Sequence, residues 1–359
     1  MPDSENCSGS GSKQRQRIAF VSTGGHVTGL GHATRQLVVA RHAVCQGHHA
    51  VVFTDASGVA ALATASGIAS EILVNIEDAS ILAAALQAHS VTHLVIDVPE
   101  PAFPALRSLA ERWPTVLVVS RVGRDFEWFG SDVILIGESM SEWETLIDST
   151  ASSPHARVHS GRAYLTFRDE FAEGIGMAAG SRPESILVAH GGADPYGLTA
   201  RCLGALEHTT RDYTVQILLG SANCDVDCIE GLASESKHNC QVTIDASDVA
   251  ARMRGACLSL ISGGNVRYES CMTGTPFVAL SISQRQFDIT EQVSGMGAGV
   301  NLGVAELISD LEIAVTVDDL VLDVERRSRM QGVMTGLFDM GGSDRILSIA
   351  LDSAKTNSA

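Results

Sequence analysis

The chain has 359 residues, which exceeds the usual size of one domain and predicts two domains with separate cores. Its 45% apolar and 19% charged residues are typical of a folded globular protein, and its formal net charge of −17 disfavours nucleic acid and anionic lipid as partners, because both require clustered Lys and Arg. No apolar run approaches the roughly 20 residues that span a bilayer and the N-terminus lacks a signal-peptide core, so we expect a cytoplasmic protein without membrane insertion.

The first half of the chain alternates strand and helix patterns after a polar start. Residues 1–16 are rich in Ser and Gly and lack apolar periodicity, so we expect a flexible tail. From residue 17 to residue 160, short apolar runs alternate with helical patterns, which predicts right-handed βαβ units and a parallel sheet. The predicted strands of this N-terminal Rossmann-like domain are residues 18–21, 50–54, 93–97, 115–119 and 133–136. The predicted helices are residues 34–45, 58–65, 79–87 and 102–111.

A second alternating series follows a junction that we place at residues 161–184. It predicts a C-terminal Rossmann-like domain over residues 185–353, followed by a tail at 354–359. The predicted strands are residues 186–190, 213–219, 241–244, 257–261 and 277–280. The predicted helices are residues 196–206, 246–253, 266–272, 287–296 and a long stretch from 318 onward. Two such domains predict an α/β fold whose parallel sheets face an interdomain cleft, a preferred place for small ligands.

A glycine-flanked histidine follows the first predicted strand. His32 stands beside Gly29 and Gly31, at a strand-to-helix turn that leads to the carboxyl ends of parallel strands, where open α/β sheets bind ligands. A helix N-terminus disfavours the imidazolium form, so a neutral ring is available there to accept a proton. We therefore predict that His32 is a general base at the interdomain cleft. A helix-capping or core histidine is the alternative.

The first glycine pair of the second domain is Gly191 and Gly192, directly after a predicted strand. Asp194 is expected as the N-cap of the following helix and Pro195 as its first residue. Glycines let the backbone approach a phosphate closely, and helix amides favour negative charge. The pair is therefore a candidate diphosphate cradle, although a tight turn without a ligand also requires glycine.

The second glycine pair, Gly263 and Gly264, precedes Asn265 and another predicted helix. It is the second half of the candidate diphosphate cradle. Glu269 lies one turn into that helix, where a carboxylate can accept both hydroxyls of a nucleotide ribose. A solvent-facing helix residue is the alternative for Glu269.

Several other polar groups are weaker candidates. His26 could line the same loop as His32 or only shape its turn. The eight cysteines lack paired spacing and indicate reduced thiols, and no predicted site holds a metal. The weak metal candidates are the cluster His42, Cys45, His48 and His49, the pair Cys224 and Cys228, and the pair Asp225 and Asp227.

With these motifs in order, the chain resembles the PseG/SpsG-type nucleotide-sugar hydrolases of pseudaminic acid biosynthesis. These are relatives of the MurG-like glycosyltransferases, which have the GT-B fold. The resemblance covers most of residues 17–293. It is carried by the segments 29–35, 161–171, 191–195 and 262–264, together with Glu269 and the segment 274–276.

The resemblance implies a function for each motif. His32 matches the family base that activates water for attack on the anomeric carbon of a UDP-linked sugar. Gln286 matches a family glutamine in the nucleotide-sugar loop, and no metal or redox cofactor is implied. The predicted partners are a nucleotide sugar and, in the alternative below, a hydroxyl acceptor. The predicted substrate-binding residues are Gly29, Gly31, Arg35, Gly191, Gly192, Asp194, Gly263, Gly264, Asn265, Glu269 and Gln286.

Three segments depart from the family pattern. Asp97 is followed by Val-Pro-Glu-Pro where the family has an aspartate-tyrosine-aspartate pattern, Ser120-Arg121 replaces paired aspartates, and Arg285 replaces an asparagine. These changes fall where the sugar or acceptor should sit. A nucleotide-sugar hydrolase is therefore the leading prediction. A glycosyltransferase with the same base and a hydroxyl acceptor is the first alternative, and a non-catalytic nucleotide-sugar-binding protein is the second.

Overall fold

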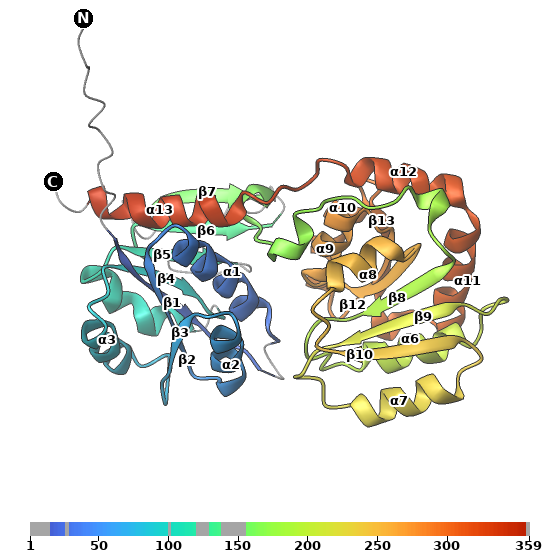
Figure 1. Ribbon diagram of the computed structural model, residues 1–359, viewed down its shortest axis with the longest axis horizontal. Helices are drawn as coiled ribbons and strands as arrows, with labels where there is room; N and C mark the ends of the chain where they lie inside the picture. The colour runs from blue at the N-terminus through green and yellow to red at the C-terminus, as the bar shows by residue number, and fades with distance from the viewer. Residues whose placement is uncertain (1–14, 26–28, 100–101, 120–128, 138–155, 357–359) are drawn as a thin grey trace, which may run out of the picture.

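The computed structural model describes residues 15–25, 29–99, 102–119, 129–137 and 156–356. They form two α/β domains that lie side by side (Figure 1). Each domain contains one parallel sheet with helices packed on both faces. The predicted pair of Rossmann-like domains is therefore confirmed.

The first domain contains a seven-stranded sheet of order β3-β2-β1-β4-β5-β6-β7. Its strands are β1 (Arg17–Ser22), β2 (His49–Thr54), β3 (Ala69–Ile72), β4 (His93–Asp97), β5 (Thr115–Val119), β6 (Asp132–Ile136) and β7 (Arg157–Gly161). Strands β4, β5 and β6 are buried throughout, because helices cover their Val, Ile and Leu runs on both faces. The strand order reverses between β1 and β4, which creates the switch point where open α/β sheets bind ligands.

Helices cover both faces of this first sheet. They are α1 (Gly31–Cys45), α2 (Ser57–Ala65), α3 (Ala79–Ala88), α4 (Phe103–Leu106) and the 3-10 helix η2 (Arg107–Glu111). Successive side chains of a strand point to opposite faces, so Phe20 of β1 packs with α1 and α2 whereas Val21 packs with α3 and α4. Because α1 follows β1 in the chain, the first turn of α1 lies at the switch point.

The second domain contains a six-stranded sheet of order β10-β9-β8-β11-β12-β13. Its strands are β8 (Ser185–Ala189), β9 (Thr214–Leu219), β10 (Asn239–Ile244), β11 (Leu258–Ser262), β12 (Phe277–Ser281) and β13 (Gly299–Val304). Its helices are α6 (Leu198–Leu206), α7 (Val226–Glu235), α8 (Val249–Gly255), α9 (Val266–Thr273), α10 (Gln284–Ser294), α11 (Asp310–Leu322) and α12 (Val324–Met334). The strand order reverses between β8 and β11, so both glycine pairs lie at the switch point of this sheet.

The last helix, α13 (Gly342–Thr356), returns to the first domain and packs against α1 and the strands β4, β5 and β6 (Figure 1). Its residues Ile346 and Leu347 are buried in the same core cluster as α1. Ser353 donates a hydrogen bond to the buried carboxylate of Asp132 on β6. Residues 342–353, which the sequence placed in the second domain, therefore belong to the core of the first. The one long helix predicted from residue 318 is three helices.

Among the described residues, three strands and one α-helix were not predicted from the sequence. Strands β3 and β7 lie at the two edges of the first sheet and are only partly buried, so they lack an apolar run. Strand β13 is interrupted by glycine. Helix α7 buries only Ile229, because it covers the outer edge of the second sheet.

Candidate functional site

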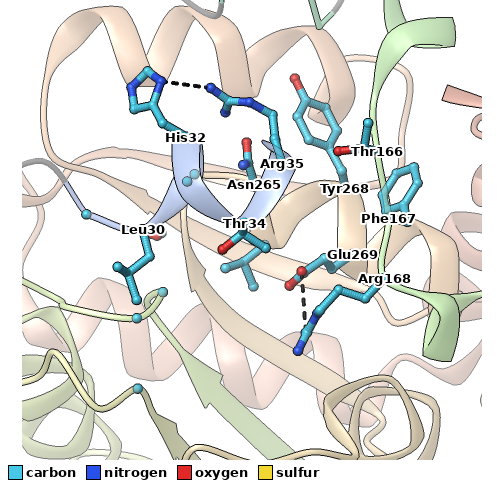
Figure 2. A pocket seen from close by; sticks show the side chains of 18 of the residues that line it. Leu30, His32, Thr34, Arg35, Thr166, Phe167, Arg168, Asn265, Tyr268 and Glu269 are labelled. Carbon is cyan, nitrogen blue, oxygen red and sulfur yellow. Dashed lines mark hydrogen bonds and ion pairs between the residues drawn. The ribbon is translucent and has the colours of Figure 1, made fainter. Parts of the chain in front are cut away.

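A cavity of about 1190 Å³ lies between the two domains, where the switch points of the two sheets face each other. Figure 2 shows the first turn of α1 opposite the first turn of α9. The residues predicted for the site all line this cavity: His32, Gly29, Gly31, Arg35, Gly191, Gly192, Asp194, Gly263, Gly264, Asn265, Glu269 and Gln286. The fold thus brings together motifs that lie more than 200 residues apart in the chain.

His32 is hydrogen-bonded to Asp97 at the end of the neighbouring strand β4. Its Nδ1 lies 2.6 Å from Oδ1 of Asp97, and two facing lone pairs would repel each other at that distance. We therefore assign the Nδ1–H tautomer, in which His32 donates to the carboxylate. This leaves the lone pair on Nε2, to which no described residue forms a hydrogen bond. The side chain of His32 is 19% exposed, so the ring can be reached from the cavity.

The carboxylate of Asp97 is fully buried and receives several donors. Arg35 donates from Nε to Oδ2 at 3.0 Å and from Nη2 to Oδ1 at 2.9 Å, and Gln36 adds a longer bond of 3.4 Å to Oδ2. Burial opposes ionisation of Asp97, but Arg35 and His32 outweigh it and hold the pKa of the carboxyl below its ordinary value. Asp97 is therefore ionised at neutral pH. The predicted substrate ligand Arg35 is engaged with this carboxylate.

The two domains approach each other closely at the glycines of the cavity. A β-carbon added at Gly31 would lie 3.6 Å from Nδ2 of Asn265, and one added at Gly192 would lie 2.9 Å from Cδ1 of Leu30. The turn that carries His32 thus lies directly against both glycine turns of the second domain. This juxtaposition brings a base and two helix N-termini to the same small volume.

The first glycine turn differs from the prediction. Gly191 has a φ of 90°, which favours glycine, but α6 begins at Leu198 rather than at Pro195. Asp194 accepts hydrogen bonds from the backbone amides of Leu198 at 3.0 Å and Thr199 at 2.7 Å. Its carboxylate therefore already occupies the amides that an anion would need at this helix N-terminus. The geometry gives Asp194 a capping role, and the backbone of Gly191 and Gly192 lines the cavity beside it.

The second glycine turn leaves backbone donors free. A β-carbon at Gly263 would clash with α10, lying 2.8 Å from Cγ of Gln286, whereas one at Gly264 would meet no atom closer than 3.5 Å. Arg267 donates hydrogen bonds to the carbonyls of both glycines and fixes the turn. Among the described residues, nothing accepts a hydrogen bond from the amides of Gly264 and Asn265. Together with the helix dipole of α9, these amides are suited to a phosphate.

Glu269 faces the cavity from the first turn of α9 and points toward Arg168 (Figure 2). Nη2 of Arg168 lies 3.6 Å from Oε1 of Glu269, while Nη1 of the same guanidinium lies 2.9 Å from Oε1 of Glu170. Burial raises the pKa of the Glu269 carboxyl, Arg168 lowers it, and Glu170 raises it further, with a net rise. Arg168 was not singled out from the sequence, although it lies in the motif of residues 161–171.

A second histidine in the cavity wall is not an available base. His190 ends β8, and both of its ring nitrogens are buried without a partner among the described residues. Burial lowers its pKa to about 4, against a smaller opposing effect of Asp194, so the ring stays neutral and inaccessible. Of His32 and His190, His32 is the one whose ring reaches the cavity beside an ionised carboxylate. A third histidine, His42, also lines the cavity and is paired with the exposed Asp344.

The remaining candidates have ordinary environments. Gln286 uses its Oε1 to accept a hydrogen bond from the amide of Ile282 at 2.7 Å, and so caps the turn before α10. His42 is paired with Asp344 of α13. No cluster of three or more metal-ligating residues occurs within the described ranges, and none of the helices described there is long and apolar enough to cross a membrane. His26, Glu100, Pro101, Ser120 and Arg121 lie outside the described residues.

Comparison with solved structures identifies the architecture. MurG of Acinetobacter baumannii matches 94% of the chain and 99% of its own length, with a TM-score of 0.64 and 14% identity. The Anabaena protein HepE, solved in complex with UDP and glucose, matches 94% of the chain and all of its own length, with a TM-score of 0.63 and 15% identity. The chain has the GT-B fold.

A curated sequence is similar to part of this GT-B chain. The spore coat polysaccharide biosynthesis protein SpsG of Bacillus subtilis (strain 168) is 25% identical over 203 residues. The match covers 55% of the chain and 59% of SpsG, which is less than two thirds of that relative. No protein-family model matches. These findings support the resemblance to SpsG-type proteins and leave the choice between hydrolase and transferase open.

Proposed function

We propose that this GT-B chain cleaves the anomeric C–O bond of a nucleotide-activated sugar, with His32 as the general base. The single observation that carries the proposal is the 2.6 Å contact between Nδ1 of His32 and Asp97, on a turn whose Gly31 lies against Asn265 at the start of α9. A base and an anion-binding helix N-terminus at the same place are what the reaction requires, because one proton must leave the attacking group while a diphosphate departs.

In the proposed reaction, Nε2 of His32 takes the proton of the attacking hydroxyl as its oxygen bonds to the anomeric carbon. The bond from that carbon to the diphosphate oxygen breaks, and the nucleoside diphosphate leaves with the electron pair. The amides of Gly264 and Asn265 face the charge that develops on the leaving group. Asp97 stabilises the imidazolium that forms on His32. The carboxylate of Glu269 accepts hydrogen bonds from the ribose hydroxyls.

We favour water as the attacking group, because the sequence motifs resemble those of the PseG/SpsG-type nucleotide-sugar hydrolases, and the similarity to SpsG supports that resemblance. A glycosyltransferase is the second candidate, and one observation favours it. Among the described residues, those that line the cavity at the ends of β4, β5 and β6 and in α4 are apolar: Val98, Pro99, Phe103, Val119, Ile136 and Gly137. Polar residues such as Thr34, Arg41 and Ser66 line the side formed by α1 and α2. Such a wall suits an apolar hydroxyl acceptor better than water or a sugar.

A substrate panel tests these functions. Purified protein would be incubated with UDP-, dTDP- and GDP-sugars, with and without small phenols and sugars as acceptors, and the released nucleoside diphosphate measured. Release without acceptor supports the hydrolase, and release only with acceptor supports the transferase. Binding without turnover, by contrast, supports a non-catalytic binding protein.

The variant His32→Ala tests the base. It should lower the rate on the order of 10²- to 10⁴-fold, because that is the usual contribution of a positioned general base. The nucleotide diphosphate should still bind. Turnover at the native rate would refute the assignment of His32.

A further inference from the structure

The charge of Asp97 is balanced without His32. This carboxylate is fully buried and ionised, and Arg35 holds it through two bonds of 2.9 and 3.0 Å. Arg35 is itself only 7% exposed and lies one helical turn after His32 on α1. A buried carboxylate without a counter-charge is strongly unfavourable, so one cation must lie beside it. Arg35 supplies that cation permanently, because a guanidinium does not lose its proton in proteins.

We propose that Arg35 is a positioning residue that holds Asp97 as a balanced carboxylate and thereby leaves His32 neutral, with Nε2 free to accept a proton. The proposal rests on the proposed function of His32 as a base. It assigns Arg35 to the dyad rather than to the substrate, where the sequence motif had placed it.

The geometry around His32 supports this role. Nη2 of Arg35 lies 3.1 Å from Nδ1 of His32, so a positive charge lies next to the ring and opposes a second one on it. The N-terminus of α1, in whose first turn His32 stands, acts in the same direction. Without Arg35, His32 would be the one cationic partner that the described residues offer to the buried charge of Asp97. That charge would favour the imidazolium form, so the ring would act as a base only at higher pH.

The other elements that face His32 bring no competing charge. Asp97 is the charged group from β4, Arg35 is the charged group from α1, and Gln36 adds a neutral amide to Asp97. Across the cleft, α9 presents the neutral Asn265 against Gly31. Within the described part of the chain, no further ionisable side chain contacts the ring. The balance therefore depends on one carboxylate and one guanidinium.

The test is the titration of His32 itself, followed by NMR of the ring carbon against pH. The chain contains 12 histidines, so the signal would be assigned from its loss in His32→Gln. In Arg35→Gln, the pH midpoint of His32 should rise by about one unit or more, because an unbalanced carboxylate lies beside the ring. In Asp97→Asn, the midpoint should fall below that of the native protein, because only the guanidinium remains. In the double variant it should return toward the native value.

Activity provides the second measurement. In Arg35→Gln, the acid limb of the pH profile of kcat/KM should move to higher pH together with the NMR midpoint, while the Kd for UDP stays within twofold. Arg35→Lys, which keeps the charge, should restore most of the native profile. A loss of UDP affinity in Arg35→Gln with an unmoved His32 midpoint would show that Arg35 is a substrate ligand and overturn the proposal.

The opposite shifts expected for Arg35→Gln and Asp97→Asn keep the proposal testable if one variant does not fold. Unmoved midpoints, or shifts of the same sign, would overturn it. The titration needs no substrate, so it is independent of the panel of nucleotide sugars. If the panel shows no turnover but the midpoints shift as expected, the proposed function fails while the coupling between Arg35 and His32 stands.

Discussion

Substitution by alanine should lower the stability of the protein at Gly263, but should lower its UDP affinity at the adjacent Gly264. In Gly263→Ala, the added β-carbon would lie 2.8 Å from Cγ of Gln286 and 2.9 Å from Oγ of Ser281, and would also clash with Thr290. The turn cannot move away easily, because the amide of Gly263 bonds to β12 and its carbonyl accepts from Arg267. Overpacking of this kind costs roughly 2 kcal/mol of unfolding free energy.

The matched substitution Gly264→Ala places its β-carbon no closer than 3.5 Å to any atom. Its unfolding free energy should change by less than about 0.5 kcal/mol. The methyl group would instead project beside the free amides of Gly264 and Asn265, where the proposed phosphate must approach. We therefore expect the UDP affinity to fall about tenfold, which corresponds to 1.4 kcal/mol.

Urea unfolding followed by circular dichroism and UDP titration by calorimetry would measure both effects. Native thermal and chemical stability of Gly263→Ala would refute the packing argument. Unchanged UDP affinity of Gly264→Ala, in a protein of native stability, would refute the placement of the diphosphate at this turn. Because the two positions are neighbours, each variant serves as the control for the other.

Three further outcomes follow from single side chains. Burial raises the pKa of Glu269. The affinity of the protein for UDP should therefore weaken on acidification at a higher pH than an exposed glutamate would give. Glu269→Gln should abolish this contribution of residue 269 to the pH dependence, which a series of Kd measurements from pH 5 to 8 checks. Asp194→Ala should cost about 1 kcal/mol of unfolding free energy through the lost cap and leave the Kd for UDP unchanged; a weaker Kd would make Asp194 a ligand. Asp132→Asn should cost about 2 kcal/mol, less than a fully buried pair because Arg157 is half exposed. Burial opposes ionisation of Asp132, but its hydrogen bonds hold its pKa below the ordinary value. The stabilisation by the ionised Asp132 is therefore present above about pH 4 and disappears on further acidification. Equal acid unfolding of Asp132→Asn and the native protein would contradict this expectation.

The location of the site could be predicted because its motifs are local. His32 and the two glycine pairs each stand at a strand-to-helix turn, and parallel strands bring such turns to one edge of a sheet. The partner of His32 could not be found in this way. Asp97 ends β4, which becomes the neighbour of β1 only through the strand order of the finished sheet. The sequence showed Asp97 only as part of a segment that departs from the family pattern.

Two other features depend on contacts that no local pattern contains. Asp194 precedes a proline as an N-cap would, but the chain continues through a left-handed Gly197 before α6 begins. The carboxylate of Asp194 therefore bonds to the first amides of α6 from a position four residues before the helix begins. Likewise, the C-terminal helix α13 is an ordinary amphipathic pattern in the sequence. Its apolar face could equally have covered either sheet, and only the packing of Ile346 on the first core decides between them.

The return of α13 means that the chain crosses between the domains twice, and the two crossings are joined. Arg345 at the start of α13 donates to the carbonyl of Ala163 at 2.8 Å and pairs with Asp339, and Gly342 packs against the carbonyl of Leu165. Two interdomain connections that are joined at one place restrict the relative motion of the domains more than one flexible linker would. We therefore expect relative motion of the domains to be rotation about the line of these connections, because the joined connections oppose sliding and twisting. A protease cut in either connection alone would leave the two halves attached.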